Sequence, residues 1–283
     1  MKVAEAIREA AASLAATSDT ARLDAELLMA EAFGVTRSEL LLRHMESPVP
    51  DGFAAMVERR MRHEPVAYIT GRQEFYGREF LVCRAVLIPR SDSESVVEAA
   101  LRACPQPARV LDCGVGSGAL LLTVLAECPD AQGIGTDRSL GALALAAANA
   151  ARLGMGDRAR MLRRDWTGDG WAKGLGGFDL VLANPPYVED AADLAPSVRQ
   201  YEPAEALFAG PEGLDDYRIL IPQLPGLLAD EGVVCLEIGA SQADPVSRIA
   251  EAAGFSAEIA RDLAGRPRAA ILRLGVGKAA ENH

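Results

Sequence analysis

The first 71 residues carry apolar side chains in the pattern of amphipathic helices. These side chains recur near helical spacing, or directly after a capping signal, in four stretches: Val3, Ile7 and Leu14; Leu23, Leu27 and Leu28; Leu40, Leu41 and Leu42; Phe53, Met56, Val57 and Met61. Thr36 and Glu39 have the spacing of a capping box just ahead of the third stretch. A helix buries one such apolar stripe, so the pattern predicts a small helical bundle over residues 1–71.

The next segment, residues 72–90, has the pattern of a connector. Polar and apolar residues over 74–82 predict a β-hairpin that turns at Gly77. The apolar run at residues 86–88 predicts one more short strand before the next domain.

From residue 91 onward, short apolar strands alternate with helical segments. Ser91 and Glu94 repeat the capping-box spacing and predict the start of a helix. Strands are predicted for six ranges: 109–113, 133–137, 159–163, 178–183, 233–238 and 269–274. Helices are predicted between most of them, including the alanine-rich stretch at residues 140–152. This alternation is typical of a doubly wound, mostly parallel sheet. Residues 91–275 are therefore predicted to form one α/β domain, followed by a polar tail at 276–283.

The first strand of this domain runs into a glycine-rich turn. The turn consists of Gly114, Val115, Gly116, Ser117 and Gly118. Glycine lets the backbone turn tightly and lets a ligand approach without meeting a Cβ atom. Dinucleotide-binding loops can carry alanine at their third glycine position, which is Ala119 in this chain, so the spacing alone does not exclude NAD.

An acidic residue ends the second strand of the domain. Asp137 lies 19 residues after Gly118. In doubly wound folds a carboxylate at this position faces the ribose of a nucleotide-like ligand and can accept from both hydroxyls. The loop and the acid together predict a nucleoside-bearing cofactor, with a ligand-free structural turn as the alternative.

The tetrapeptide Asn184-Pro185-Pro186-Tyr187 follows the apolar strand at residues 178–183. Open α/β sheets carry their chemistry at this end of a strand. Each proline disfavours helical dihedrals in the residue before it, so the tetrapeptide is predicted to be stiff and extended. A strand end capped by asparagine is the alternative.

Such a segment suits an acceptor with a planar NH2 group. The side-chain oxygen of Asn184 and the carbonyl of Pro185 can each accept one N–H, and Tyr187 can pack flat against the acceptor's π-system. No base is required before the attack, because the nitrogen can lose its proton after the new bond has formed. This fits a chain in which His283 is the only histidine after His63, so histidine triads and histidine metal sites are not expected.

Composition narrows the class of protein. The chain is 49% hydrophobic with a mean hydropathy of +0.08, which is typical of a globular protein. Acidic residues interrupt the N-terminal segment where a secretory signal would be apolar, and no apolar run is long enough to cross a bilayer. We therefore expect a soluble, cytoplasmic protein with no membrane partner. The five cysteines are scattered without a CxxC spacing, so neither a disulfide framework nor a metal site is predicted.

The net charge of −11 counts against binding to long duplex nucleic acid, because phosphate neutralisation requires a basic surface. One compact basic cluster interrupts the acidic chain: Arg59-Arg60-Met61-Arg62-His63. A solvated helix face and a docking patch for an RNA-bound or acidic partner both remain open for this cluster.

Taken together, these residues resemble the HemK-like family, the release-factor glutamine methyltransferases. The resemblance covers nearly the whole chain and is carried by the glycine loop, the Asn-Pro-Pro-Tyr motif and the following segments: Tyr68-Ile69-Thr70-Gly71, Glu74-Phe75-Tyr76-Gly77, Ile88-Pro89-Arg90, Tyr201-Glu202-Pro203 with Ala206-Leu207-Phe208, Leu236-Glu237-Ile238-Gly239 with Gln242, and a closing motif at residues 262–268, Asp-Leu-Ala-Gly-Arg-Pro-Arg. Asn-Pro-Pro-Tyr is shared with DNA amino-methyltransferases, so the connector and the closing motif carry the family-level specificity.

The resemblance implies a class I S-adenosylmethionine-dependent methyltransferase fold with a small N-terminal helical domain that helps to dock the substrate. It implies methylation of the glutamine in the Gly-Gly-Gln motif of class I peptide chain release factors, bound directly without nucleic acid, with S-adenosylhomocysteine as the product. The implied cofactor-binding residues are Gly114, Val115, Gly116, Ser117, Gly118, Asp137, Trp166 (beside the adenine) and Asn184. The implied acceptor-binding residues are Asn184, Pro185, Pro186 and Tyr187, of which Asn184, Pro185 and Tyr187 would be catalytic.

The chain departs from the family in one place. The family often has Pro-Glu-Thr-Glu where this chain has Ser91-Asp92-Ser93-Glu94. Ser93 keeps a hydroxyl, so the cofactor pocket is expected to survive, and residues 91–93 are given no site role. Three other functions remain open at the level of the sequence: methylation of a ribosomal-protein glutamine, methylation of DNA or RNA amino groups, and NAD-dependent oxidoreduction or non-catalytic binding on the same fold.

Overall fold

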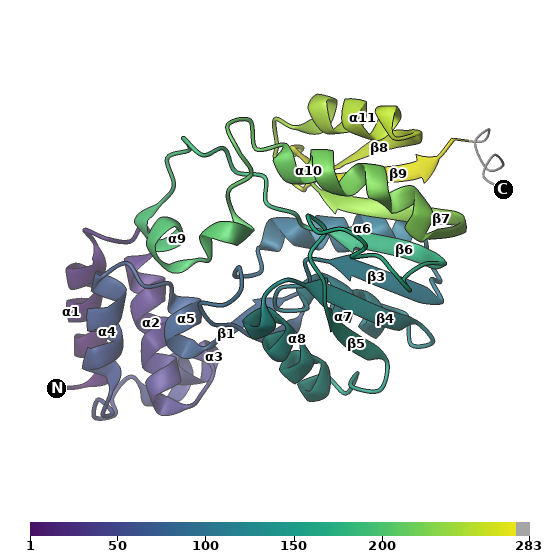
Figure 1. Cartoon of the computed structure of the whole chain (residues 1–283). Helices are drawn as coiled ribbons and strands as arrows, with labels where there is room; N and C mark the ends of the chain where they lie inside the picture. The colour runs from purple at the N-terminus through teal and green to yellow at the C-terminus, as the bar shows by residue number, and fades with distance from the viewer. Residues whose placement is uncertain (276–283) are drawn as a thin grey trace. The chain divides into compact units, whose positions relative to one another are not determined.

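A computed structural model describes residues 1–275, and the chain divides into two units (Figure 1). The first unit comprises Met1–Arg72 together with Leu194–Glu202. The second comprises Gln73–Asp193 and the chain from Pro203 onward. The predicted polar tail, residues 276–283, lies outside the described residues.

The first unit is a bundle of short helices around one apolar core. Its elements are α1 (Val3–Leu14), α2 (Ala21–Phe33), α3 (Arg37–Glu39), the π-helical turn η1 (Leu40–His44), α4 (Phe53–Met61), α5 (Val66–Thr70) and α9 (Pro196–Tyr201). Part of each predicted stripe is in the core, with Ile7, Leu14 and Leu28 fully buried, whereas Leu23, Leu42 and Met61 are exposed. The hydroxyl of Thr36 accepts the N–H of Glu39, so this capping interaction is confirmed.

Two of the three arginines in the basic cluster stabilise this bundle. The guanidinium of Arg60 donates to the carboxylate of Asp24 at 2.7 Å, and both side chains are nearly buried. Arg59 makes a two-point contact with Glu64 at 2.8 and 2.9 Å. Arg62 is exposed, and its backbone carbonyl accepts from the hydroxyl of Tyr201 in α9. Only Arg62 of the three is therefore both exposed and outside an intramolecular ion pair among the described residues.

The connector begins with the predicted hairpin, made of β1 (Arg72–Phe75) and β2 (Arg78–Leu81). Tyr76 and Gly77 form its turn with φ values of 53° and 72°, and left-handed values at both central residues are those of a tight hairpin turn. The predicted strand at residues 86–88 is wrong, because this segment has no regular secondary structure. Val86 and Ile88 are buried without being part of a sheet, and burial alone produced the strand-like pattern.

The capping box predicted at Ser91 is also wrong. Ser91–Ser93 form a 3-10 turn, η2, and α6 (Glu94–Ala103) begins after it without a side-chain cap. The carboxylate of Glu94 instead accepts the N–H of Tyr76 in the hairpin turn at 3.0 Å. A long-range contact has replaced the local one that the spacing predicted.

The second unit is built on a seven-stranded sheet with the order β5-β4-β3-β6-β7-β9-β8. Its strands are β3 (Arg109–Cys113), β4 (Gln132–Asp137), β5 (Ala159–Arg163), β6 (Phe178–Ala183), β7 (Leu228–Glu237), β8 (Phe255–Arg261) and β9 (Pro267–Leu274). The strands from β3 to β7 pair in parallel, and β9 runs antiparallel to both β7 and β8. The predicted doubly wound, mostly parallel sheet is confirmed, although β8 was not predicted.

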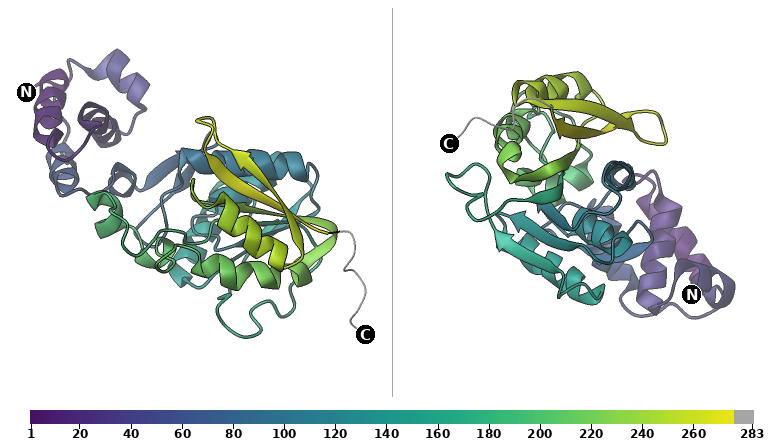
Figure 2. Two further views of the ribbon diagram at one scale, coloured as in Figure 1. Left: turned by 90° about the horizontal axis from the view of Figure 1, so that it is seen from above. Right: turned by 90° about the vertical axis from the view of Figure 1, so that its right-hand side faces the viewer.

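Helices cover both faces of this sheet (Figures 1 and 2). On one face, α6, α7 (Ala119–Glu127) and α8 (Leu140–Arg152) share an apolar core with alternate strand residues such as Val110, Leu180 and Val233. On the other face, α10 (Asp215–Leu220), the 3-10 helix η4 (Ile221–Leu227) and α11 (Ala243–Ala252) pack on the residues between, such as Leu111, Val181 and Val234. The short 3-10 turn η3 (Ala204–Ala206) lies in the loop before α10.

The register of the parallel strands aligns their carboxyl ends. Cys113 of β3 pairs with Thr136 of β4 and with Ala183 of β6, and Ala183 pairs with Leu236 of β7. The residues that come next along these four strands therefore form one row at one edge of the sheet: Gly114, Asp137, Asn184 and Glu237.

One buried side chain links the hairpin to the glycine loop. Asn149 of α8 is fully buried; its Oδ1 accepts the N–H of Leu81 at 2.7 Å, and its Nδ2 donates to the carbonyls of Leu81 and Ser117 at 3.0 and 2.8 Å.

We expect Asn149→Ala to lower the free energy of unfolding by at least about 2 kcal/mol, because each buried polar group left without a partner costs about 1–3 kcal/mol. Urea denaturation measures the change. Ala148→Ser, at the exposed neighbouring position of the same helix, should change it by no more than about 0.5 kcal/mol. An unchanged midpoint for Asn149→Ala would show that this amide does not stabilise the fold.

Candidate active site

The glycine loop turns sharply between β3 and α7. Gly114, Gly116 and Gly118 have φ values of 81°, 52° and 87°, which side chains with a Cβ atom rarely adopt. A Cβ atom on Gly114 would lie 3.1 Å from the ring of Trp166, so the backbone and the indole already approach each other closely. The loop therefore requires glycine both for its conformation and for space.

Asp137 ties this loop to the end of β4. Its Oδ2 accepts the N–H of Gly116 at 3.1 Å, and its Oδ1 accepts the N–H of Ser139 at 2.8 Å. Two backbone donors hold the carboxylate in one orientation. Each carboxylate oxygen can accept more than one hydrogen bond, so acceptor capacity is left for a ligand diol.

Trp166 is held in the loop after β5 by polar contacts at both ends. Its indole N–H donates to Asp216 at 2.9 Å, and its backbone carbonyl accepts from the side-chain amide of Gln223 at 3.1 Å. Burial raises the pKa of Asp216, and the hydrogen bond from Trp166 opposes that rise. The indole ring thus has a fixed orientation beside Gly114.

These residues line one pocket with about 1030 Å³ of empty space, counting its open mouth. Its wall combines apolar side chains with a few polar groups, which is typical of a site for a small ligand. Eight of the residues singled out from the sequence line it: Gly114, Val115, Gly116, Ser117, Asp137, Trp166, Asn184 and Pro186. Gly118, Pro185 and Tyr187 are not among the described residues of its wall.

The Asn-Pro-Pro-Tyr segment leaves β6 and is anchored directly afterwards. Val188 donates its N–H to the carbonyl of Leu207 at 2.8 Å and accepts the N–H of Ala209 at 2.9 Å. This pairing holds the segment at its carboxyl end, while β6 holds it at Ala183. Asn184 lines the pocket, and Pro185 is buried.

Tyr187 is held at its hydroxyl and at its backbone. The hydroxyl donates to Oε1 of Glu237 at 3.1 Å, and the backbone carbonyl accepts from the side-chain amide of Gln242 at 3.1 Å. Burial and the nearby Glu237 carboxylate raise the pKa of the phenol, so Tyr187 is neutral at physiological pH. Flat packing of its ring against an acceptor stays a prediction.

Asp112 is a pocket residue that the sequence analysis did not single out. It lies in β3 two positions before Gly114, is 1% exposed, and its Oδ1 has no hydrogen-bond partner in the part of the chain that the structure describes. Burial raises its pKa to about 7. A carboxyl group inside an otherwise apolar strand, next to a glycine loop, was the signal that could have revealed it.

Several further polar residues of the wall were also missed: Arg90, Ser93, Arg138, Ser139 and Glu205. Ser93 is the most informative, because it is buried in the wall although residues 91–93 were given no site role. Chemically, the pocket combines a buried carboxyl group with one unpaired oxygen, an oriented carboxylate at a strand end, an aromatic face and a carboxamide.

Within residues 1–275, no group of three or more histidine, cysteine or acidic side chains is placed to hold a metal ion. No described helix is long and apolar enough to cross a membrane.

Comparison with known proteins bears on both units. A family model for the PrmC N-terminal domain matches residues 5–71, and a model for the methyltransferase small domain matches residues 95–201. Among solved structures, a methyltransferase from Pyrococcus furiosus is similar with a TM-score of 0.53 at 16% identity, over 71% of this chain and 91% of that one. A ribosomal protein L11 methylase from Lactobacillus delbrueckii subsp. bulgaricus is similar with a TM-score of 0.50 at 21% identity, over 72% and 90%. These likenesses show the class I methyltransferase fold for the sheet unit.

Similarity in sequence extends from end to end. The chain is 42% identical to a release factor glutamine methyltransferase from Cereibacter sphaeroides, over 97% of this chain and 99% of the relative. It is 41% identical to one from Moorella thermoacetica, over 95% and 97%. Because the likeness spans the helical unit, the connector and the sheet unit that builds the pocket, this chain belongs to the release factor glutamine methyltransferase family.

Proposed function

We propose that this protein transfers a methyl group from S-adenosylmethionine to the side-chain amide nitrogen of the glutamine in the Gly-Gly-Gln motif of class I peptide chain release factors. The protein binds the release factor directly, acts in the cytoplasm, and requires neither nucleic acid nor a membrane. S-adenosylhomocysteine is the second product.

One observation carries this proposal. Asn184 of the Asn-Pro-Pro-Tyr motif lines the same pocket as the glycine loop and Asp137. A group suited to hold an amide acceptor and a set of groups suited to hold a nucleoside thus meet in one cavity. The end-to-end identity with release factor glutamine methyltransferases supports the choice of substrate.

The described residues fit the cofactor. Asp137 would accept from the ribose hydroxyls, and Trp166 would lie against the adenine. The unpaired buried oxygen of Asp112 is placed to pair with an ammonium group, which the methionine part of the cofactor carries. Gly114 and Gly116 leave the loop open for close approach. When bound, S-adenosylmethionine would supply the electrophilic methyl group on its sulfonium.

The chemistry requires the protein to orient a weak nucleophile. The lone pair of an amide nitrogen is delocalised into its carbonyl group. The Asn184 side-chain oxygen and the Pro185 carbonyl would each accept one N–H of the acceptor, which fixes the nitrogen and helps to localise its lone pair. The proton is lost after the methyl has bonded, so no side chain has to act as a base beforehand.

We assign recognition of the release factor to the helical unit at residues 1–71. Arg59 and Arg60 form ion pairs within this unit. Of the three arginines in the basic cluster, Arg62 would therefore contact the release factor.

The function is tested by incubating the purified protein with tritiated S-adenosylmethionine and a class I release factor. A release factor with the Gly-Gly-Gln glutamine replaced by alanine is the matched control, and ribosomal proteins and DNA and RNA oligonucleotides are parallel substrates. We expect label only in the intact release factor. Label in a ribosomal protein or a nucleic acid but not in the release factor would overturn the proposal, as would a thermal shift with NAD and none with S-adenosylmethionine.

Asn184→Ala removes one of the two acceptors for the substrate amide. The single-turnover rate constant at saturating cofactor should fall on the order of 10²–10³-fold, as for the loss of one transition-state hydrogen bond. The affinity for S-adenosylmethionine, measured by calorimetry, should change much less, because the glycine loop and Asp137 remain. A near-normal rate constant would mean that Asn184 only ends the strand.

The Asp112 carboxyl should make cofactor binding depend on pH. Its pKa is raised by burial to about 7, so below that pH it is protonated and cannot pair with an ammonium group. The affinity for S-adenosylmethionine should therefore rise between pH 5.5 and 7, by up to about tenfold per unit, and level off above pH 7. Calorimetry across this range is the measurement.

Two variants serve as controls for this pH dependence. Asp112→Asn should bind weakly with a flat profile, whereas Asp137→Asn should bind weakly but keep the slope. A flat profile in the unmodified protein would rule out an ionic role for Asp112.

A further inference from the structure

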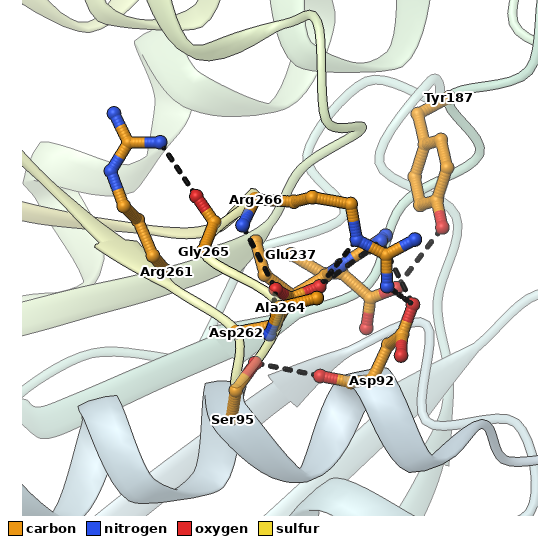
Figure 3. A network of polar contacts seen from close by, with 10 residues as sticks. Asp92, Ser95, Tyr187, Glu237, Arg261, Asp262, Ala264, Gly265 and Arg266 are labelled. Carbon is orange, nitrogen blue, oxygen red and sulfur yellow. Dashed lines mark hydrogen bonds and ion pairs between the residues drawn. The ribbon is translucent and has the colours of Figure 1, made fainter.

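Four segments far apart in the sequence meet around the carboxylate of Glu237 (Figure 3). They are the turn at residues 91–93, the Asn-Pro-Pro-Tyr motif, the end of β7, and the closing motif at residues 262–268. The proposed chemistry uses Asn184 and Pro185 but gives no role to Glu237 or to the closing motif, although both lie in segments that carry the family resemblance.

Glu237 is the last residue of β7 and is 1% exposed. Its Oε1 accepts the hydroxyl hydrogen of Tyr187, and its Oε2 has no hydrogen-bond partner among residues 1–275. Burial raises the pKa of this carboxyl, while a hydrogen bond from Ser93, the charge of Arg268 and the Tyr187 hydroxyl oppose the rise. Burying a carboxylate costs desolvation free energy, so the side chains that contact Glu237 indicate its role.

The closing motif supplies the positive charge of this cluster. The side chain of Arg268 is 10% exposed, and its Nη2 donates to Oδ2 of Asp92 at 3.0 Å. Arg266 donates to the same oxygen at 3.1 Å and to Asp262 at 2.9 Å (Figure 3). Asp92 thus holds both arginines, and Arg268 lies where it offsets the buried charge of Glu237.

Glu237 does not itself line the pocket among the described residues. It can influence the acceptor only through residues that it holds. One of these is Tyr187, whose backbone carbonyl is held in turn by Gln242. With the hydroxyl and the backbone both anchored to the segment that ends β7, the Tyr187 ring has little freedom to rotate.

We propose that Glu237 is a positioning residue of the acceptor site: its carboxylate holds the Tyr187 hydroxyl and thereby fixes the ring that borders the substrate amide. The inference rests on the proposed function, because it requires Tyr187 to be part of the acceptor site, as the family resemblance implies. If the Tyr187 ring is already fixed when the substrate binds, it restrains the plane of the substrate amide. No entropy is then lost in ordering the ring during the reaction.

The test is a double-mutant cycle between Glu237→Leu, which removes the acceptor at similar size, and Tyr187→Phe, read as kcat and KM on a class I release factor. Each single variant should lower kcat by about 10- to 100-fold, since misplacement by about 1 Å can cost about 10²-fold. The KM for the release factor and the calorimetric affinity for S-adenosylmethionine should change little. The double variant should be no slower than the slower single variant, because the two side chains act through one contact.

Glu258→Leu, the same change at an exposed position of β8, is the matched control and should have the unmodified rate. If Glu237→Leu is poorly folded, Glu237→Leu combined with Arg268→Gln removes two opposite charges that interact in the interior and should fold with the same low kcat.

Two kinetic results would overturn the inference while the unmodified protein still methylates the release factor. The first is a normal kcat in a Glu237 variant. The second is a double variant whose loss equals the product of the single losses, which would show that Glu237 and Tyr187 act independently. Failure of the unmodified protein to methylate any release factor would instead overturn the proposed function, and this inference with it.

Discussion

Cys113 of β3 pairs in register with Thr136 of β4 on one side and with Ala183 of β6 on the other. Neighbouring strands lie about 4.8 Å apart, so this register sets the spacing between the glycine loop, Asp137 and Asn184. A slip of one residue would turn each side chain to the opposite face of the sheet. Every polar contact of the pocket therefore depends on the parallel pairing of these strands, which the apolar cores on both faces hold in place.

Two buried carboxyl groups at this edge are used in different ways. Asp112 faces the pocket with one oxygen unpaired, and burial brings its pKa to about 7, which leaves it ready for a cation. Glu237 does not line the pocket among the described residues and is partnered by Tyr187, with Arg268 opposing the effect of burial on its pKa. The first arrangement suits a ligand that arrives and leaves, whereas the second suits a permanent restraint. The two acids differ because of their partners, since both lie in strands of the same sheet and are equally buried.

Much of the fold was predictable from local pattern. The strands at 109–113, 159–163 and 178–183 and the helix at 140–152 were predicted with the bounds that the structure has, because each is a dense apolar or alanine-rich run flanked by glycine, proline or polar residues. β8 was missed because its side chains alternate between buried and exposed along an edge of the sheet, where polar residues are tolerated. The strand predicted at 86–88 failed for the opposite reason, since apolar residues are buried there without strand pairing.

The sequence by itself determined the order of elements, the glycine loop, Asp137 and the Asn-Pro-Pro-Tyr segment, because each depends on neighbours within a few residues. Only the tertiary structure decided which distant side chains pair. Asp92 pairs with Arg266 and Arg268, which lie more than 170 positions further along the chain. Residues 91–93 depart from the family pattern, yet Asp92 still provides the carboxylate that both arginines bind. Asp112 could be noticed as a carboxyl group in an apolar strand, but its unpaired oxygen and its raised pKa come from packing against other segments. Glu237 gave no local signal of its role, because a lone acid in a strand acquires its partner only when the sheet brings other segments against it.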